Sequence, residues 1–202
     1  MFEFRNLKMI KTRYPLLLGS KSPRRQQLLK DMGLDFSVVE IETDETVPVS
    51  VRPEDAAVFL AEKKAASCIE RYSHEILLTA DTTVILDREI LGKPSGTEEA
   101  GKMLKKLSGR DHEVVTGICI AFNGRLHTAS DSTRVFFRDL SDKEIGHYIN
   151  HYKPFDKAGA YGIQEWIGMI GIRRIEGSYF NVVGLPVMSM YRILRDHDLL
   201  KL

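Results

Sequence analysis

Three basic residues surround the start of a predicted helix near the N-terminus, and they are the first candidates for chemistry. Ser22 is a favourable N-cap and Pro23 suits the first helical position, so we expect the helix to begin here. Lys21, Arg24 and Arg25 flank that start, although the helix dipole disfavours each cation there by roughly 0.3–1 kcal/mol. Phosphate binds well at helix N-termini, and arginine contacts it through two N–H groups. The turn is a candidate phosphate site, and a solvated cap with ordinary surface arginines is the alternative.

Two carboxylates are candidates for holding a cation or a water molecule. Asp81 interrupts the apolar run 76–86, a predicted strand, and a buried carboxylate costs several kcal/mol unless it is paired, hydrogen-bonded or metal-bound. Since no glycine, proline or asparagine adjoins Asp81, a functional role is favoured over a turn. Glu45 falls on the buried side if the alternation of the predicted strand 36–42 continues. A solvated acidic loop is the alternative for Glu45.

Three lysines are weaker candidates for contacts with an anion. Lys64 falls inside the apolar stripe of a helix predicted over 53–72, so its amine either reaches solvent or finds an anion. Lys93 lies on a tight loop between a glycine and a proline. Lys157 begins the glycine-bearing segment 157–164, whose small residues let the backbone approach a ligand or form a flexible connector.

These candidates are distributed along one alternating series of strands and helices. Asn123-Gly124 predicts a hairpin turn, and Ser141 with Glu144 predicts a capping box at a helix start. The pattern predicts strands at 36–42, 76–86, 114–122, 125–138 and 169–175. It predicts helices at 23–31, 53–72, 97–107 and 141–150, and a terminal helix after residue 186 that runs to about residue 196.

Composition predicts one core over 1–202, as a single domain or as two closely packed lobes, with no autonomous second domain. Residues 1–14 are expected to be an N-terminal extension. The 202 residues are 43% hydrophobic, which is enough for one core. The net charge of +1 gives no overall field to attract nucleic acid. Cys68 and Cys119 are too few for a disulfide framework, and neither a signal peptide nor an apolar run of ~18–20 residues is evident. We expect a cytoplasmic protein that binds neither nucleic acid nor membrane.

Several ordered motifs together resemble the Maf (septum-formation) family of nucleoside triphosphate pyrophosphatases. The resemblance runs from about residue 16 to about residue 194. The motifs lie at 20–25, 80–82, 92–94, 156–164, 175–179 and 183–186. The resemblance implies a mixed α/β fold, with a strongly bent central mixed sheet flanked by helices and two lobes around a deep cleft, as in inosine triphosphate pyrophosphatases. It also implies a homodimer.

The resemblance further implies hydrolysis between the α- and β-phosphates, giving a nucleoside monophosphate and pyrophosphate with a divalent metal, Mg²⁺ or Mn²⁺. Asp81 matches the catalytic acid, and Glu45 matches the acid that supports the metal, so the two are the predicted metal ligands. The predicted substrate-binding residues are Ser20, Ser22, Arg24, Arg25, Lys64, Thr82, Lys93, Lys157 and Gln164.

Within that set, the positions of Arg24, Thr82 and Gln164 imply a preference for dTTP and UTP over 7-methyl-GTP. Lys21 departs from the resemblance, because a small residue is usual there. A non-catalytic nucleotide-binding regulator of cell division and septum formation is the alternative. Both functions need the phosphate turn, but only the enzyme needs Asp81 and a metal.

Overall fold

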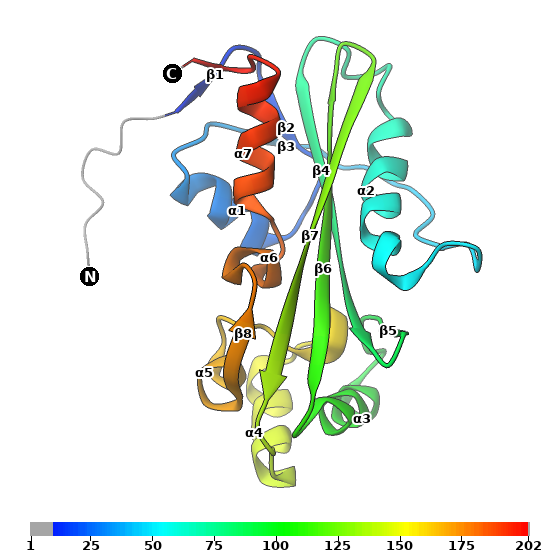
Figure 1. Ribbon diagram of the computed structural model, residues 1–202, viewed down its shortest axis with the longest axis vertical. Coiled ribbons are helices and arrows are strands. Elements are labelled where there is room, and N and C mark those ends of the chain that lie inside the picture. The colour runs from blue at the N-terminus through cyan, green and yellow to red at the C-terminus, as the bar shows by residue number, and fades with distance from the viewer. Residues whose placement is uncertain (1–9, 202) are drawn as a thin grey trace.

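A seven-stranded mixed sheet forms the centre of the computed structural model, which describes residues 10–201 (Figure 1). Its strands follow the order β3-β2-β4-β6-β7-β8, and β5 pairs with part of β4. The strands are β2 (Leu16–Leu18), β3 (Ser37–Val38), β4 (Ile76–Leu86), β5 (Glu89–Leu91), β6 (Asp111–Phe122), β7 (Arg125–Phe137) and β8 (Ile172–Glu176). Since β2 runs parallel to β3 and β4 while the other pairs are antiparallel, the predicted mixed sheet is confirmed.

Helices cover both faces of this sheet. The helices are α1 (Pro23–Asp31), α2 (Ala56–Ala66), α3 (Thr97–Leu107), α4 (Asp142–Tyr152), α5 (Trp166–Gly171), α6 (Tyr179–Val183) and α7 (Val187–Asp196). Figure 1 shows α2 on one side of the long strands, α1, α6 and α7 on the other, and α3, α4 and α5 around their far end. The fold class predicted from the sequence, a mixed sheet flanked by helices, is therefore confirmed.

Side chains of β4 alternate between two hydrophobic layers. Leu77 packs in a small cluster with Ala61 of α2, whereas Leu78 and Ala80 belong to the large core. The α2 backbone lies directly on β6 at Gly117, where an added Cβ would come 2.2 Å from the backbone nitrogen of Val58. Because only glycine permits this approach, α2 is held close against the strands that carry the site.

In the described part of the chain, one edge of β4 has no neighbouring strand over its central residues, which leaves a gap there. β2 pairs with β4 over residues 76–78, and β5 pairs with β4 over residues 84–86. Among the described strands, residues 79–83 are paired only on the other side, with β6. Asp81 and Thr82 lie in this gap, on opposite faces of the strand. The gap leaves room beside them for a cleft.

Several local predictions are confirmed. The Asn123-Gly124 turn joins β6 to β7 with positive φ at both residues, and the capping box of Ser141 and Glu144 opens α4. α3 spans the predicted residues 97–107.

Three boundaries predicted from the sequence are wrong. The helix predicted over 53–72 is a 3-10 turn at Pro53–Asp55 followed by α2, which ends at Ala66 as the chain enters a series of turns. The strand predicted over 36–42 is reduced to β3. Residues 169–175 form the end of α5 and then β8, since a short apolar run does not distinguish helix from strand.

The first and last strands of the described residues pair with each other at one side of the molecule. β1 (Lys11–Thr12), which falls in the predicted extension, forms an antiparallel pair with β9 (Leu200–Lys201). In the part of the chain that the structure describes, no helix has the length and apolar character needed to cross a bilayer.

Candidate active site

A cleft of about 470 Å³ opens along the gap in β4 and gathers every predicted site residue. The residues come from the β2–α1 turn and the first turn of α1, from the loop after β3, from α2 and β4, and from the loop after β5 and the segment before α5. Those in the wall are Ser20, Ser22, Arg24, Arg25, Glu45, Lys64, Asp81, Thr82, Lys93, Lys157 and Gln164. Its volume lies in the range typical of small-molecule sites.

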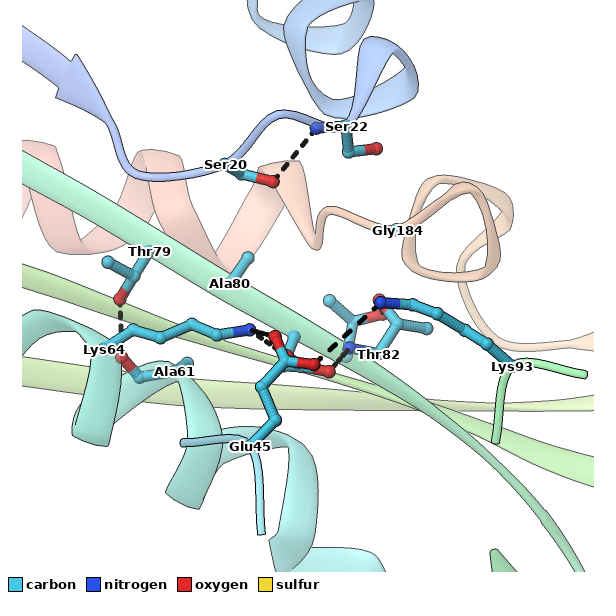
Figure 2. Close-up of polar contacts among 12 residues, drawn as sticks. Ser20, Ser22, Glu45, Ala61, Lys64, Thr79, Ala80, Thr82, Lys93 and Gly184 are labelled. Carbon is cyan, nitrogen blue, oxygen red and sulfur yellow. Dashed lines mark hydrogen bonds and ion pairs between the residues drawn. The ribbon is translucent and has the colours of Figure 1, made fainter. Parts of the chain in front are cut away.

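On the α2 side of the cleft, one lysine joins two carboxylates. The Thr79 hydroxyl donates a 2.6 Å hydrogen bond to the Ala61 carbonyl, which ties α2 to β4 (Figure 2). Lys64 lies nearly one helical turn beyond Ala61, and Asp81 lies two residues beyond Thr79 on the same face. The Lys64 ammonium, whose side chain is only 11% exposed, therefore forms an ion pair with Asp81. Of the two predicted alternatives for Lys64, the structure shows contact with an anion.

Glu45 is the second carboxylate at this lysine. Its oxygen lies 2.7 Å from the Lys64 amine, and its other oxygen lies 4.0 Å from that of Lys93 (Figure 2). The Glu45 side chain is 53% exposed, so the prediction of a buried acid is wrong. The loop after β3 leaves the sheet before Glu45, and the strand phase does not reach it. Its carboxylate nonetheless faces the cleft.

The start of α1 forms the opposite side of the cleft. Ser22 occupies the N-cap position and Pro23 the first helical position, but the Ser22 side chain makes no capping hydrogen bond. Instead, the Ser22 N–H donates to the Ser20 hydroxyl at 3.3 Å (Figure 2). Arg24 forms a 2.9 Å ion pair with Asp156, which lies far along the chain. The predicted helix start is confirmed, but the Ser22 side chain does not cap the helix as predicted.

Arg25 has only neutral partners among the described residues. Its Nε donates to the Gly184 carbonyl at 2.7 Å, and its Nη1 donates to the Ser20 hydroxyl at 3.1 Å and the Ala80 carbonyl at 2.9 Å. Its Nη2 donates to the Thr82 hydroxyl at 3.0 Å. Burial lowers the pKa of Arg25, and the nearby Asp81 charge opposes that shift. The guanidinium is held in place, but no carboxylate in the described chain pairs with its charge.

A second group of charges closes the far end of the cleft. The Lys157 amine, on a side chain that is 9% exposed, lies 2.7 Å from Asp156 and 3.2 Å from Glu165. Burial acts to raise the pKa of Asp156, but hydrogen bonds from Lys157 and Arg24 outweigh it and lower that pKa. Asp156 thus shares its charge between Lys157 and Arg24.

Gln164 presents a polar atom without a partner. Its Oε1 is buried in the cleft wall and accepts no hydrogen bond from any described residue. A buried acceptor left in this way costs roughly 1–3 kcal/mol, so a ligand donor would gain that contact.

The oxygen-only donor set fits a magnesium-type cation. Asp81 and Glu45 both contact the Lys64 amine, so oxygens of both already lie around one positive charge. No cluster of three or more metal-binding side chains occurs in residues 10–201. Mg²⁺ commonly uses one or two protein carboxylates together with substrate phosphates and water, so two suffice.

Sequence reasoning missed the acidic partners of the cleft cations. Asp156 and Glu165 hold Lys157, and Glu40 forms an ion pair with Lys21 at the cleft wall. Asp156 adjoins a predicted site residue, which was a usable signal. Its pairing with Arg24 across 132 positions has no counterpart in local sequence.

Comparison with known proteins identifies the family. The chain matches the family described as Maf-like protein over residues 15–197. It is 46% identical over 185 residues to the dTTP/UTP pyrophosphatase of Phocaeicola vulgatus, covering 91% of this chain and 96% of that protein. It is also 46% identical over 188 residues to the dTTP/UTP pyrophosphatase of Porphyromonas gingivalis, covering 91% and 94%. For the dTTP/UTP pyrophosphatase of Flavobacterium johnsoniae the identity is 45% over 183 residues, covering 90% and 94%. The chain belongs to the Maf-like protein family.

Proposed function

We propose that this protein hydrolyses dTTP and UTP between the α- and β-phosphates, releasing the nucleoside monophosphate and pyrophosphate. The proposal is supported by relatives named dTTP/UTP pyrophosphatase, which align with about nine-tenths of the chain. It is supported equally by a cleft in which cations and carboxylates from distant segments converge.

The observation that carries the proposal is that a positive charge unpaired within the described chain and two carboxylates lie on opposite sides of the cleft. Arg25, whose charge no carboxylate of the described chain pairs, lies on the side of the α1 start, and the carboxylates of Asp81 and Glu45 lie on the α2 side. A nucleoside triphosphate with a bound cation needs both kinds of charge. Phosphoryl transfer depends mainly on positioning and on neutralising charge, which this arrangement supplies.

In the proposed mechanism, Asp81 orients the attacking water molecule and accepts its proton. The backbone N–H of Thr82 donates to Asp81 at 2.8 Å, and Lys64 holds another carboxylate oxygen, so the side chain is fixed. Asp81 and Glu45 would hold Mg²⁺ or Mn²⁺, which when bound neutralises charge on the phosphate oxygens. Arg25, Lys64, Lys93 and the start of α1 bind the triphosphate.

The base is read by Gln164 in this proposal. Its buried Oε1 accepts from the N3–H of uracil or thymine, and its amide donates to O4. Cytosine presents the opposite pattern at these atoms, so it would leave the Gln164 oxygen unpaired. A mismatch of this kind costs roughly 1–3 kcal/mol for each unpaired group.

We further propose that the protein acts in the cytoplasm as a homodimer. Cys68 and Cys119 are both free, which suits a reducing compartment. The homodimer follows from the resemblance to the Maf family. Light scattering coupled to gel filtration tests it, and a monomeric mass at micromolar concentration contradicts it.

The direct test is product formation from a substrate panel. Purified protein is given dTTP, UTP, CTP, ATP, GTP and 7-methyl-GTP with Mg²⁺, with Mn²⁺ or with a chelator, and products are separated by anion exchange. We expect dTTP and UTP to exceed the other nucleotides by at least about tenfold in kcat/KM, with monophosphate and pyrophosphate as products and no turnover in chelator. Binding without turnover would instead indicate the non-catalytic regulator. A panel led by 7-methyl-GTP would contradict the base reading.

A further inference from the structure

Behind Arg25, a series of hydrogen bonds runs along one face of the sheet, across β4 and β6, to α6. Arg25 donates from Nη2 to the Thr82 hydroxyl at 3.0 Å, and the hydroxyls of Thr82 and Thr116 lie 3.0 Å apart. The Thr116 hydroxyl donates to the backbone carbonyl of Asn181 at 2.8 Å. Thr116 and Asn181 are both 0% exposed, so water cannot replace these partners.

The donor and acceptor in each of these three hydrogen bonds follow from the groups at the two ends of the series. A guanidinium only donates and a carbonyl only accepts. Since Thr116 uses its single hydroxyl proton on Asn181, Thr82 must donate to Thr116 and accept from Arg25. Each threonine has one proton, so no other order forms all three bonds.

The far end of the series is itself fixed. The Asn181 side chain accepts from the Thr116 N–H at 3.1 Å and donates to the Val114 carbonyl and the Thr133 hydroxyl, each at 2.9 Å. Ser178 accepts from the Asn181 N–H at the start of α6, and the bonds of the Asn181 side chain tie this helix to β6 and β7. The carbonyl that Thr116 contacts therefore cannot easily turn away.

We propose that Thr116 is a positioning residue for nucleotide turnover, acting through Thr82 to fix the fork of Arg25 toward the triphosphate. Thr116 does not line the cleft, so it has no contact with substrate of its own. Its hydroxyl keeps the Thr82 oxygen turned toward Arg25. The inference rests on the proposed function, because Arg25 is the triphosphate ligand there.

The chain offers a matched control one residue along β4. Thr83 is also buried and pairs in register with Val115 of β6, as Thr82 pairs with Thr116. Its hydroxyl contacts the Val115 carbonyl at 3.5 Å on the α2 face and has no link to Arg25. Thr83→Val therefore removes a buried hydroxyl of the same ladder without touching the proposed network.

The experiment is a kinetic double-mutant cycle with dTTP. Thr116→Val should lower kcat/KM about fivefold to tenfold, Thr116→Ser should restore it to within about twofold, and Thr83→Val should leave it unchanged. In an Arg25→Ala background, Thr116→Val should have no further effect, because the group it positions is gone. An undiminished loss in that background, or an equal loss in Thr83→Val, overturns the proposal.

Two further measurements test the role of Thr116 even if Thr116→Val does not fold or the proposed function is wrong. If Thr116→Val does not fold, Thr82→Val breaks the same link and must show the same dependence on Arg25. If the wild-type protein releases no pyrophosphate, the proposed function fails. Hydrogen exchange at the Arg25 Nη2 protons, which donate to Thr82, then decides the network in ligand-free protein. Faster exchange in Thr116→Val but not in Thr83→Val supports it, and equal exchange in both overturns it.

Discussion

The two faces of strand β4 hold charge in different ways. On the face toward α2, Asp81 and Glu45 share the amine of Lys64, so ionised groups of both signs are in contact. On the other face, Thr82 accepts from Arg25, whose further partners are also neutral oxygens. Ionised pairs can exchange one partner for a metal or a water molecule, whereas the charge of Arg25 is left for a ligand. The adjacent residues Asp81 and Thr82 thus face two different parts of the cleft, one suited to a cation and the other to an anion.

The largest expected effect is on the charged face. Asp81→Asn keeps the shape of the side chain but removes its charge and its basicity. We expect kcat for dTTP to fall at least a hundredfold, within the ~10²–10⁴ range of general-base contributions. Asp87→Asn is the control, because Asp87 is an exposed carboxylate directly after the same strand. An Asp81→Asn enzyme with near-normal turnover would remove Asp81 from the mechanism.

The neutral face extends to His112 of β6, whose burial lowers its pKa from 6.5 to about 4. Its Nε2 lies 2.7 Å from the Tyr161 hydroxyl, and Asp111 is the nearby charge. Between pH 6.5 and pH 4 the unfolded chain binds a proton at His112 that the folded protein does not, so stability falls as pH falls.

From pH 7 to pH 4.5 this one group should cost about 2 kcal/mol of unfolding free energy. Urea denaturation at both pH values measures it. In His112→Gln the loss should be smaller by that amount, while His147→Gln, at an exposed position on α4, should behave as wild type. Equal acid sensitivity in His112→Gln and wild type would show that the histidine is not held neutral.

The two arginines at the start of α1 sharpen the contrast within one helical turn. Arg24 shares its charge with Asp156, but Arg25 has no such partner among the described residues. Arg25→Ala should therefore weaken binding of a non-hydrolysable dTTP analogue about thirtyfold, and Arg24→Ala less than about fivefold. Titration calorimetry measures both. A greater loss of binding in Arg24→Ala than in Arg25→Ala would contradict this prediction. It would show that the ion pair with Asp156 does not keep Arg24 from binding the ligand.

The smallest effect concerns the base. Gln164→Glu replaces the amide donor with a second acceptor, which suits O4 of uracil and thymine less well. We expect the preference for dTTP over CTP to shrink about tenfold, with a smaller change in the total rate of hydrolysis. Competition assays with both nucleotides in one reaction measure the ratio. An unchanged ratio would place base selection elsewhere in the cleft.

Local patterns predicted much of this molecule from sequence. The capping box at Ser141, the hairpin at Asn123 and the amphipathic helix over 97–107 each depend on neighbours in sequence, and each is confirmed. Asp81 stood out because a carboxylate interrupted an apolar strand, and the structure places it at the cleft.

What sequence could not supply was pairing across distance. The exposure of Glu45 depends on where a loop leaves the sheet. The short helix α5 packs Gly168 so closely against the Ile163 carbonyl that a larger residue would clash there. The contact of Thr116 with Asn181 joins residues 65 positions apart. Such contacts depend on the register of strands and on helix docking, which no local spacing records.

The most direct test of the two-sided cleft is the affinity of Asp81→Asn and Arg25→Ala for one non-hydrolysable dTTP analogue, measured by calorimetry in Mg²⁺. The account predicts that Asp81→Asn binds within about threefold of wild type while losing turnover, and that Arg25→Ala binds about thirtyfold more weakly. Loss of binding in Asp81→Asn together with wild-type affinity in Arg25→Ala would contradict it.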